Sequence, residues 1–368
     1  MRVLFAAGGT GGHIYPAIAV AKELTTRRSD ATVRFVGTAR GLETRLVPQA
    51  GFELSLIESA GLMNMGLAAR LRGLSVLPKS FLGARRLLAE FRPDAVVGAG
   101  GYVTGPVLLT AALAGKPTLV MESNAVPGFT NRRLARFVRA AAVSFEMSVP
   151  YFGGKAVVTG NPVRREFFAV PAKRRDPGRV ELLLFGGSQG ARAVNDAMTA
   201  ALAHLEPLRP VLRVTHQTGK LDFERVRAAY AAAGWSESAD VREYIDDMVS
   251  AFAAADLIVS RAGATTAAEL MAAGKTAVMV PLPGQIEQRR NAEALEQAGA
   301  ARMIAQAELT GERLAAEIGA LVQNPDEITR REQAARKLAK PEAAAMIVGM
   351  IERLAETRSR KPEAGSQK

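Results

Sequence analysis

"FAAGGTGGHIYPAIAVAKEL", residues 5–24, places Gly8, Gly9, Gly11 and Gly12 between an apolar run and a helical pattern. A strand that ends in glycines and leads into a helix exposes backbone N–H groups at the positive end of the helix dipole. Such a segment is typical of a doubly wound α/β domain that binds an anion beyond the end of the strand. A tight turn without a ligand is the alternative interpretation.

The second half of the chain opens in the same way, with "ELLLFGGSQGAR" at residues 181–192. A shift of 178 residues aligns four loop residues of the first half with Gly186, Gly187, Ser188 and Gly190. A dinucleotide fingerprint would need a glycine at Ile14, and a Walker loop would need one at Glu269, so neither is expected. Two similar domains are expected instead.

Short apolar runs alternate with helical patterns along the chain, and several runs are continuously apolar, which is typical of parallel strands covered on both faces. The sequence predicts strands at 2–7, 32–37, 94–100, 117–122, 141–145, 180–187, 212–219, 257–263 and 276–282. We expect domains at 1–160 and 161–340, a helix at about 341–358 that packs back onto the first domain, and a flexible tail at 359–368.

The composition and net charge of the chain limit the classes of function that are expected. The 368 residues contain no cysteine, which excludes disulfides and thiolate sites. The net charge is +12, and residues 1–160 hold 19 Lys and Arg against 9 Asp and Glu. A basic half favours nucleic acid, an anionic membrane surface or a phosphorylated substrate. Five tyrosines and one tryptophan argue against stacking on bases. Residues 95–115 are uncharged, but their glycines and proline predict strand, turn and helix rather than a membrane span.

Loops after successive first-half strands should meet at one edge of a parallel sheet. They carry His13, Tyr102, Thr104, Glu122 and Asn124. Each has a structural alternative: Asn124 as a helix cap, for example, and Glu122 as a solvated charge.

In the second half, "SRAGATTAAELMAAG" at residues 260–274 places Arg261 and Gly263 before a helix start. Glu269 could accept two hydrogen bonds from a ribose diol, or it could complement the helix dipole. Gln288 and Asn291 follow the next strand and suit sugar hydroxyls, or they form a polar helix start.

Five stretches together, "GGTGGHIYP", "GGYVTGP", "GNPVR", "FGGSQGAR" and "SRAGATTAAELMAAGK", resemble the MurG family over nearly the whole chain. These are the membrane-associated N-acetylglucosaminyltransferases of peptidoglycan synthesis. The resemblance implies a GT-B fold, in which two Rossmann-like, doubly wound parallel-sheet domains face a cleft. It also implies inverting transfer of N-acetylglucosamine from UDP-N-acetylglucosamine to the C4 hydroxyl of the muramoyl sugar of undecaprenyl-diphosphate-linked lipid I, which forms lipid II.

The resemblance also assigns residues to the donor. It implies that Ser188 and Arg164 contact the diphosphate, Ile245 offers its backbone to uracil, Glu269 binds the ribose hydroxyls and Gln288 holds the transferred sugar. The residues implied around the ribose and phosphates are Ala264, Thr265, Thr266, Ala267 and Ala268, with the loop N–H groups of Gly187, Gln189 and Gly190. From the other domain, Thr10, Gly11, Gly12 and Asn124 should complete the cleft.

His13 is our candidate general base, because a neutral imidazole can take the hydroxyl proton near pH 7; the alternative is that it only binds a phosphate. Glu122 is a weaker catalytic candidate. Two diphosphates meet in the reaction, which matches two glycine loops. The chain has no Asp-x-Asp triplet, so we expect no cofactor and no essential metal.

Residues 61–88 mix apolar and basic side chains without an acid, which suits an anionic bilayer surface. The predicted membrane patch is Leu62, Met63, Met65, Arg70, Arg72, Leu77, Lys79, Phe81, Arg85 and Arg86. An ordinary amphipathic helix pair is the alternative. We expect a peripheral location on the cytoplasmic face of the bacterial inner membrane, possible cell-wall and division partners, and no nucleic acid. The rivals are a diacylglycerol glycosyltransferase, a UDP-N-acetylglucosamine 2-epimerase and a basic nucleic-acid-binding protein.

Overall fold

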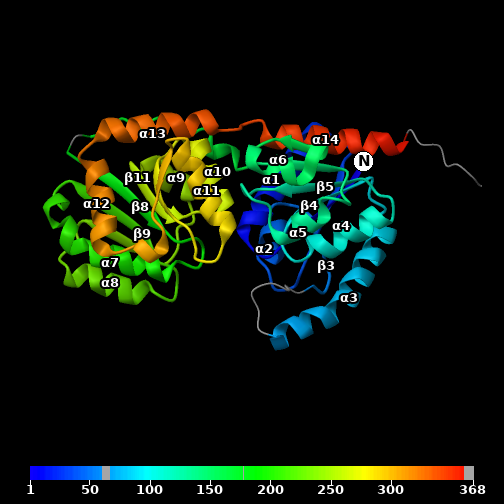
Figure 1. Cartoon of the computed structure of the whole chain (residues 1–368), viewed down its shortest axis with the longest axis horizontal. Coiled ribbons are helices and arrows are strands. Elements are labelled where there is room, and N and C mark those ends of the chain that lie inside the picture. The colour runs from blue at the N-terminus through cyan, green and yellow to red at the C-terminus, as the bar shows by residue number, and fades with distance from the viewer. Residues whose placement is uncertain (60–66, 177, 360–368) are drawn as a thin grey trace, which may run out of the picture. The chain divides into compact units, whose positions relative to one another are not determined.

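The computed structural model describes residues 1–59, 67–176 and 178–359. The chain divides into two compact units (Figure 1). Unit 1 is Met1–Arg164 together with the chain from Lys340 onward, and unit 2 is Arg165–Ala339. The first unit therefore runs to Arg164 rather than to residue 160. The expected tail falls largely on residues 360–368, outside the described residues.

Unit 1 is built on a seven-stranded parallel sheet in the order β3-β2-β1-β4-β5-β6-β7. Its strands are β1 (Arg2–Ala7), β2 (Thr32–Gly37), β3 (Glu53–Leu56), β4 (Ala95–Gly100), β5 (Thr118–Glu122), β6 (Ala140–Val143) and β7 (Ala156–Val158). Its helices are α1 (Gly11–Arg27), α2 (Glu43–Gln49), α3 (Leu67–Phe91), α4 (Thr104–Leu113), α5 (Phe129–Leu134), α6 (Val149–Phe152) and α14 (Ala343–Ser359), with short 3₁₀ turns η1 (Glu146–Ser148) and η2 (Gly153–Lys155).

Unit 2 repeats the design with a six-stranded parallel sheet in the order β10-β9-β8-β11-β12-β13. Its strands are β8 (Val180–Phe185), β9 (Leu212–Gln217), β10 (Ala239–Arg242), β11 (Leu257–Arg261), β12 (Ala277–Val280) and β13 (Ala301–Met303). Its helices are α7 (Arg192–Leu205), α8 (Phe223–Ala232), α9 (Met248–Ala254), α10 (Ala264–Ala273), α11 (Ile286–Gln297), α12 (Gly311–Val322) and α13 (Pro325–Leu338), with 3₁₀ turns η3 (Arg165–Phe167), η4 (Glu206–Leu208) and η5 (Gln306–Glu308).

The expected α/β class with two doubly wound parallel sheets is confirmed. In each sheet the chain winds outward from the centre in one direction and then in the other. The order of strands reverses between β1 and β4 in unit 1, and between β8 and β11 in unit 2. Ligands of open α/β sheets bind beyond the carboxyl ends of the strands at such a reversal. Each glycine loop follows one strand of such a pair.

The C-terminal helix α14 packs against α1 in unit 1 (Figure 1). Ile347, Val348 and Ile351 are fully buried in the same core cluster as Ile14 and Ala17 of α1. Burying an aliphatic side chain of this size contributes about 1.5–3 kcal/mol each. The apolar face of α14 therefore fastens the C-terminal part of the chain to unit 1, although the rest of unit 1 comes from the first 164 residues.

The uncharged segment at residues 95–115 folds as β4 and α4, as its glycines predicted. In the part of the chain that the structure describes, no helix is long and apolar enough to cross a membrane. The short strands β3, β7, β10 and β13 were not predicted, and each lies at an edge of its sheet.

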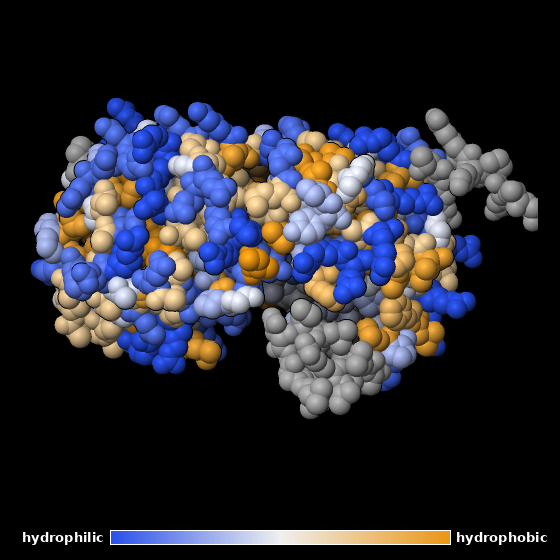
Figure 2. Space-filling view, viewed as in Figure 1, coloured by the Kyte–Doolittle hydropathy of each residue, from blue (hydrophilic) through white to orange (hydrophobic). Residues whose placement is uncertain are grey.

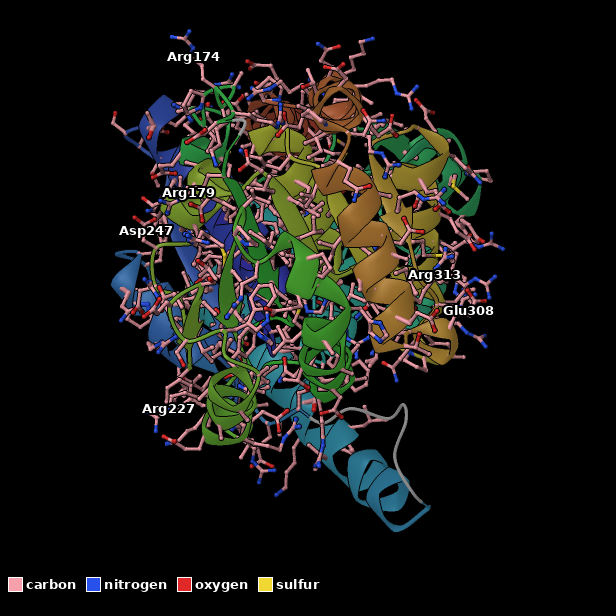
Figure 3. All side chains as sticks on the ribbon, turned by 90° about the vertical axis from the view of Figure 1, so that its left-hand side faces the viewer. Arg174, Arg179, Arg227, Asp247, Glu308 and Arg313 are labelled. Carbon is pink, nitrogen blue, oxygen red and sulfur yellow. The ribbon has the colours of Figure 1, made fainter. Side chains whose placement is uncertain are left out.

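Both units expose apolar as well as hydrophilic side chains on their surfaces. On unit 1, exposed apolar side chains stand among hydrophilic ones over the region of α3, α4 and α5 (Figure 2), and Leu82, Leu113 and Phe137 are exposed. On unit 2, charges of both signs are interspersed (Figure 3). There, for example, Arg313 Nη2 lies 2.8 Å from Glu317 Oε1.

Candidate functional site

The glycine loop after β1 surrounds a buried carboxylate that the sequence analysis missed. Glu43, the first residue of α2, is fully buried. Its Oε2 accepts a hydrogen bond of 2.9 Å from the Gly9 N–H, and its Oε1 accepts bonds from the N–H (2.8 Å) and hydroxyl (2.9 Å) of Thr38. A Cβ on Gly8 would lie 2.8 Å from Glu43 Oε1. The bare backbone at Gly8 thus makes room for this carboxylate.

His13 lies in the first turn of α1, beside the same loop. Its Nδ1 is 3.3 Å from the Gly8 carbonyl oxygen, so Nδ1 carries the proton and Nε2 carries the lone pair. The ring packs over Gly100 at the end of β4, where a Cβ would collide with it. Burial lowers the pKa of His13, although the Gly8 hydrogen bond and the charge of Glu43 oppose that shift. The imidazole is therefore neutral near pH 7.

Glu122 ends β5 and is buried, with an exposed fraction of 3%. One carboxylate oxygen accepts bonds from the backbone and side-chain nitrogens of Asn124, both at 2.9 Å. The other accepts from Gly128 N at 3.1 Å and Asn131 Nδ2 at 2.8 Å. Burial raises the pKa of Glu122 and these four bonds oppose the rise. The arrangement indicates that Glu122 positions Asn124, rather than the catalytic role the sequence suggested.

The remaining candidates of unit 1 fall into two groups. Thr104 is fully buried, and its hydroxyl has the carbonyl oxygens of Ala6 and Gly100 within reach of its one proton, at 3.0 and 2.8 Å, and accepts from Gly100 N at 3.1 Å, so this hydroxyl is structural and not a ligand contact. Thr10, Gly11 and Gly12 lie at the start of α1, and Thr10 is exposed. Tyr102 is 60% exposed. Arg164 lies in unit 1, with its guanidinium carbon 5.6 Å from the centre of the Tyr15 ring.

The second glycine loop follows β8 in unit 2. Gly187 has φ +93°, a left-handed conformation that favours glycine, and Gly9 has φ +89° in the first loop. Ser188 and Gln189 are exposed, and Gly190 N bonds back to Gly187 O at 2.9 Å. Among the described residues, no hydrogen bond engages the Gly187 N–H. This loop is therefore open to an anion.

Gln217, the last residue of β9, joins two predicted donor-binding loops and was not predicted. Its Nε2 donates to Gly187 O at 2.9 Å, and its Oε1 accepts from Ile245 N at 3.0 Å. Gln217 is buried, as is Ile245. The Ile245 N–H is thus already engaged, which leaves the Ile245 carbonyl oxygen as its backbone group for a base.

Helix α10 begins directly after β11, with Gly263 as its N-cap and no side-chain cap. The first intrahelical bond runs from Ala267 N to Gly263 O at 2.9 Å. The N–H groups of Ala264, Thr265 and Thr266 therefore precede the first intrahelical bond, at the positive end of the dipole. Ala267 and Ala268 are buried, and the Ala267 N–H is already bonded to Gly263 O. Glu269 is half-buried in the second turn.

Other candidates of unit 2 are engaged within the protein. Arg261 donates to the Val280 carbonyl at 3.2 Å and to Gln306 Oε1 at 2.7 Å. Asn291 is buried and donates to the Ala262 carbonyl at 3.2 Å. Gln288 Oε1 accepts from Leu282 N at 3.0 Å, which orders the loop after β12. These hydrogen bonds stabilise the loops at the end of the unit 2 sheet where the donor is expected to bind.

The predicted membrane patch is partly described. Leu62, Met63 and Met65 lie outside the described residues, and of Arg70 and Arg72 only the helical backbone is described. Lys79, Arg85 and Arg86 are exposed on α3, whereas Leu77 and Phe81 are half-buried. The alternative of an amphipathic helix holds for the end of α3, where Ala84, Leu87, Leu88 and Phe91 are buried in a core cluster with α4.

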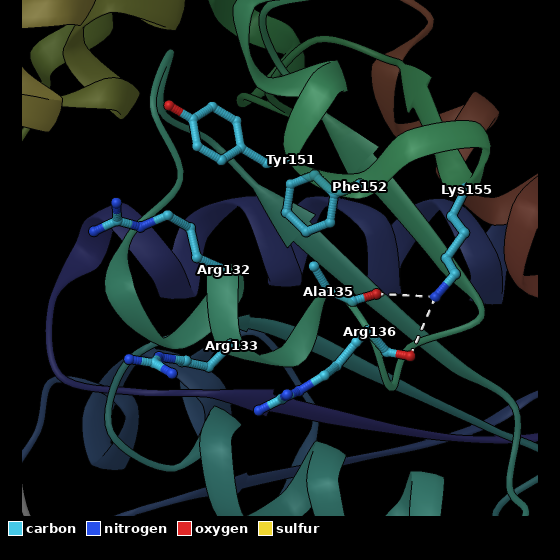
Figure 4. A pocket seen from close by; sticks show the side chains of 7 residues that line it. All are labelled: Arg132, Arg133, Ala135, Arg136, Tyr151, Phe152 and Lys155. Carbon is cyan, nitrogen blue, oxygen red and sulfur yellow. Dashed lines mark hydrogen bonds between the residues drawn. The ribbon is translucent and has the colours of Figure 1, made fainter.

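A basic cavity of about 450 Å³ lies near α5 and α6 in unit 1 (Figure 4). It is lined by Arg132, Arg133, Ala135, Arg136, Tyr151, Phe152 and Lys155. Lys155 Nζ donates to the carbonyls of Ala135 and Arg136, at 3.0 and 3.3 Å, so this amine helps to fix the end of α5. Three arginines beside the half-exposed ring of Tyr151 form a surface suited to anionic groups. Across residues 1–59, 67–176 and 178–359, no group of three or more His, Asp or Glu could hold a metal ion.

Comparison with known proteins identifies the family. The sequence matches the N-terminal domain of glycosyltransferase family 28 over residues 3–143 and the C-terminal domain of that family over residues 181–347. A protein of Anaeromyxobacter sp. (strain Fw109-5) is 46% identical over 374 residues, covering 100% of this chain and 97% of that protein. It is named UDP-N-acetylglucosamine--N-acetylmuramyl-(pentapeptide) pyrophosphoryl-undecaprenol N-acetylglucosamine transferase.

The fold comparison agrees. The crystal structure of Acinetobacter baumannii MurG is similar, with a TM-score of 0.77 and 34% identity, covering 96% of this chain and 99% of that chain. The crystal structure of a protein named putative UDP-N-acetylglucosamine 2-epimerase, from Listeria monocytogenes, has a TM-score of 0.71, covering 98% of this chain and 97% of that chain. At 16% identity, that likeness shows the fold alone. The GT-B architecture expected from the sequence is thus confirmed, and the chain belongs to the MurG family within glycosyltransferase family 28.

Proposed function

We propose that this chain transfers N-acetylglucosamine from UDP-N-acetylglucosamine to lipid I, which forms lipid II in peptidoglycan synthesis. The observation that carries the proposal is 46% identity over the whole chain to a transferase named for that reaction. The chain is a hexosyltransferase, and both family 28 domains are present. The geometry of the two units supplies a role for each end of the reaction.

On the donor side, unit 2 binds UDP-N-acetylglucosamine where its strand order reverses. The open N–H of Gly187 and the exposed hydroxyl of Ser188 bind the diphosphate, together with the first N–H groups of α10. The Glu269 carboxylate accepts hydrogen bonds from the ribose hydroxyls, and the Ile245 carbonyl oxygen accepts a hydrogen bond from the uracil N3–H. As UDP leaves, its growing negative charge is stabilised by the same N–H groups and by the helix dipole.

On the acceptor side, His13 takes the proton of the muramoyl C4 hydroxyl. The 3.3 Å contact between Nδ1 and the Gly8 carbonyl leaves Nε2 as the proton acceptor. Burial keeps the imidazole neutral near pH 7, since it lowers the pKa. The oxygen then attacks the anomeric carbon from the face opposite to UDP, which inverts the configuration. No metal takes part in this scheme.

Unit 1 also supplies the attachment to the membrane in this proposal. The basic cavity near α5 and α6, the exposed arginines of α3 and the exposed apolar Leu82, Leu113 and Phe137 are supporting observations. Basic side chains contribute about 1 kcal/mol each at an anionic bilayer, and neighbouring apolar groups add to the binding. The enzyme is therefore peripheral on the cytoplasmic face of the inner membrane, where its lipid-linked acceptor lies.

The test is incubation of the purified protein with radiolabelled UDP-N-acetylglucosamine and lipid I, with and without EDTA. Label should pass into a lipid-extractable disaccharide product in both reactions, with one UDP released per transfer. Formation of a UDP-linked epimer, or UDP release without the disaccharide, would reject the function. A product that forms only without EDTA would retain the function but reject the metal-free scheme.

A further inference from the structure

Glu43 and His13 bond to opposite ends of one peptide unit. The peptide between Gly8 and Gly9 has its N–H on Glu43 Oε2 at 2.9 Å, and its carbonyl oxygen lies 3.3 Å from His13 Nδ1. The chain of contacts therefore runs from carboxylate through peptide to imidazole. Hydrogen bonds in such a chain polarise one another, so a negative charge at one end strengthens the acceptor at the other.

The pocket of Glu43 is specific to a carboxylate of this length. Three donors converge on its two oxygens, two of them from Thr38. A Cβ on Gly37 would lie 2.5 Å from Glu43 Cγ, and a Cβ on Gly41 would collide with its carboxylate. Buried charge is costly unless it is hydrogen-bonded, and here backbone and hydroxyl donors meet it.

The second loop differs from the first at one N–H group, because the carbonyl oxygens of Gly9 and Gly187 both accept a hydrogen bond. There Gln217 donates to Gly187 O at 2.9 Å, and no described group takes the Gly187 N–H. In the first loop Glu43 takes the Gly9 N–H, and Leu42 N donates to Gly9 O at 3.3 Å. In the first loop the Gly9 N–H is therefore bonded to the internal carboxylate of Glu43. In the second loop the equivalent Gly187 N–H is open to a ligand.

We infer that Glu43 is a positioning residue for the acceptor step: through the Gly8–Gly9 peptide it fixes the tautomer, orientation and basicity of His13. This inference rests on the proposed function. It assigns Glu43 no contact with substrate and no proton transfer of its own. Its charge and length matter because the Gly8 carbonyl must point at Nδ1 for Nε2 to accept the acceptor proton.

The nearest cation that the structure places against this part of α1 is Arg164, whose guanidinium carbon lies 5.6 Å from the centre of the Tyr15 ring. Glu43 on α2 raises the imidazole pKa, while β4 brings the uncharged Gly100. On α14, Glu352 lies 3.5 Å from Arg27 at the far end of α1, and on β2 Arg34 pairs with Glu53 and Glu90. Loss of the Glu43 charge should therefore lower the pKa of His13.

The experiment compares Glu43→Gln and Glu43→Asp with the wild type in the lipid I assay. In Glu43→Gln, an amide NH₂ replaces one of the two carboxylate oxygens that accept bonds from Gly9 and Thr38. The Gly8–Gly9 peptide and the His13 base should then be misplaced, and kcat should fall on the order of 10- to 100-fold. The KM for UDP-N-acetylglucosamine should stay within about twofold, because the donor binds unit 2. The acid limb of the kcat/KM profile for lipid I should move to lower pH. Glu43→Asp keeps the charge but shortens the reach, so kcat should fall with the acid limb unmoved.

Val47→Ala is the matched control, because Val47 lies on the same helix and is fully buried, but its side chain is apolar and cannot hydrogen-bond to the loop. It should lower thermal stability and leave kcat unchanged. Wild-type kcat in Glu43→Asp, or in Glu43→Gln, would overturn the inference, as would an equal loss in Val47→Ala. If Glu43→Gln does not fold, Glu43→Asp decides. Failure of the proposed function is distinguishable, because the wild type itself would then form no lipid II.

Discussion

Gly8 follows β1 and Gly100 is the last residue of β4, and each faces a side chain that a Cβ would displace. Glu43 lies against Gly8, and the His13 ring lies against Gly100. The sequence suggested that the two glycine loops match the two diphosphates that meet in the reaction. At the level of single residues the two loops differ, because Glu43 occupies the Gly9 N–H while the Gly187 N–H stays open to a ligand. We therefore assign the donor diphosphate to the second loop and proton transfer to the first.

His13→Ala should lower kcat on the order of 10²-fold or more, as expected for loss of a general base. Donor KM should change little, since the donor binds unit 2. Because burial lowers the His13 pKa, wild-type activity should fall on the acid side only below the ordinary histidine range near 6.5. Steady-state kinetics from pH 5 to 8 would check both. Near-wild-type turnover in His13→Ala would exclude the base and leave a phosphate contact.

Gln217→Leu should raise the donor KM up to about 30-fold with a smaller change in kcat, since two buried hydrogen bonds are worth roughly 1 kcal/mol each. The reason is that the amide sets the spacing between the Gly187 and Ile245 loops. UDP-N-acetylglucosamine titration measures it. Leu221→Ala is the control, because Leu221 is in the neighbouring loop and 95% exposed. Equal effects in both variants would contradict the assignment.

At the scale of helices and strands, the sequence predicts what is buried on both faces. The central strands β1, β4, β8 and β11 are apolar runs and were all predicted. The missed strands β3, β7, β10 and β13 have three or four residues each and lie at sheet edges. An edge strand has one neighbour, so it can be short and mixed in polarity, as at Ala239–Arg242, or apolar over only three residues, as at Ala156–Val158. Their pairing is decided by the neighbouring strand, which the local sequence does not reveal.

The residues of the candidate site could likewise be predicted only where a local motif marks them. Residues inside glycine motifs, such as His13 and Ser188, could be selected because the motif marks a strand end. Glu43 and Gln217 lie 34 and 30 positions from the glycines they hold. Their roles depend on which strands pair, so no short pattern marks them. The glycines around Glu43, at positions 37 and 41, were the available signal.

The β9 strand carries a pH-dependent stability term. His216 is buried between Tyr230 and Asn195, at 3.1 Å from each, and burial lowers its pKa to about 3. Below about 6.5 the unfolded chain binds a proton that the folded chain does not. Stability from this site is therefore complete above pH 6.5 and is lost as pH falls toward 3, by at most about 1.4 kcal/mol per unit.

Urea unfolding at pH 7.5 and 5.5 measures this term. Trp235 is the single tryptophan and is buried in unit 2, so its fluorescence reports that unit. The wild type should lose more unfolding free energy between the two pH values than His216→Gln does. Equal losses would show that His216 is not held neutral in the folded unit.

At the scale of the whole molecule, the excess of basic residues in the first half of the chain would favour binding of unit 1 to an anionic bilayer. Replacing Arg132, Arg133 and Arg136 with Gln should weaken binding to anionic liposomes on the order of 10²-fold at low salt, at about 1 kcal/mol per cation. Activity on a short-chain soluble acceptor should change little. Co-sedimentation with vesicles containing phosphatidylglycerol measures the binding.

The matched control removes three exposed arginines from unit 2, namely Arg179, Arg227 and Arg313 (Figure 3). It changes the net charge equally and should leave liposome binding nearly intact. Equal weakening would mean that net charge, and not the surface near α5 and α6, drives the association.

A crystal structure with UDP bound tests the unequal roles of the two loops most directly. The account predicts the diphosphate against the Gly187 N–H and Ser188, the ribose at Glu269, and the Gly9 N–H still bonded to Glu43. A nucleotide diphosphate bound at the Gly9 N–H, with Glu43 displaced, would contradict it.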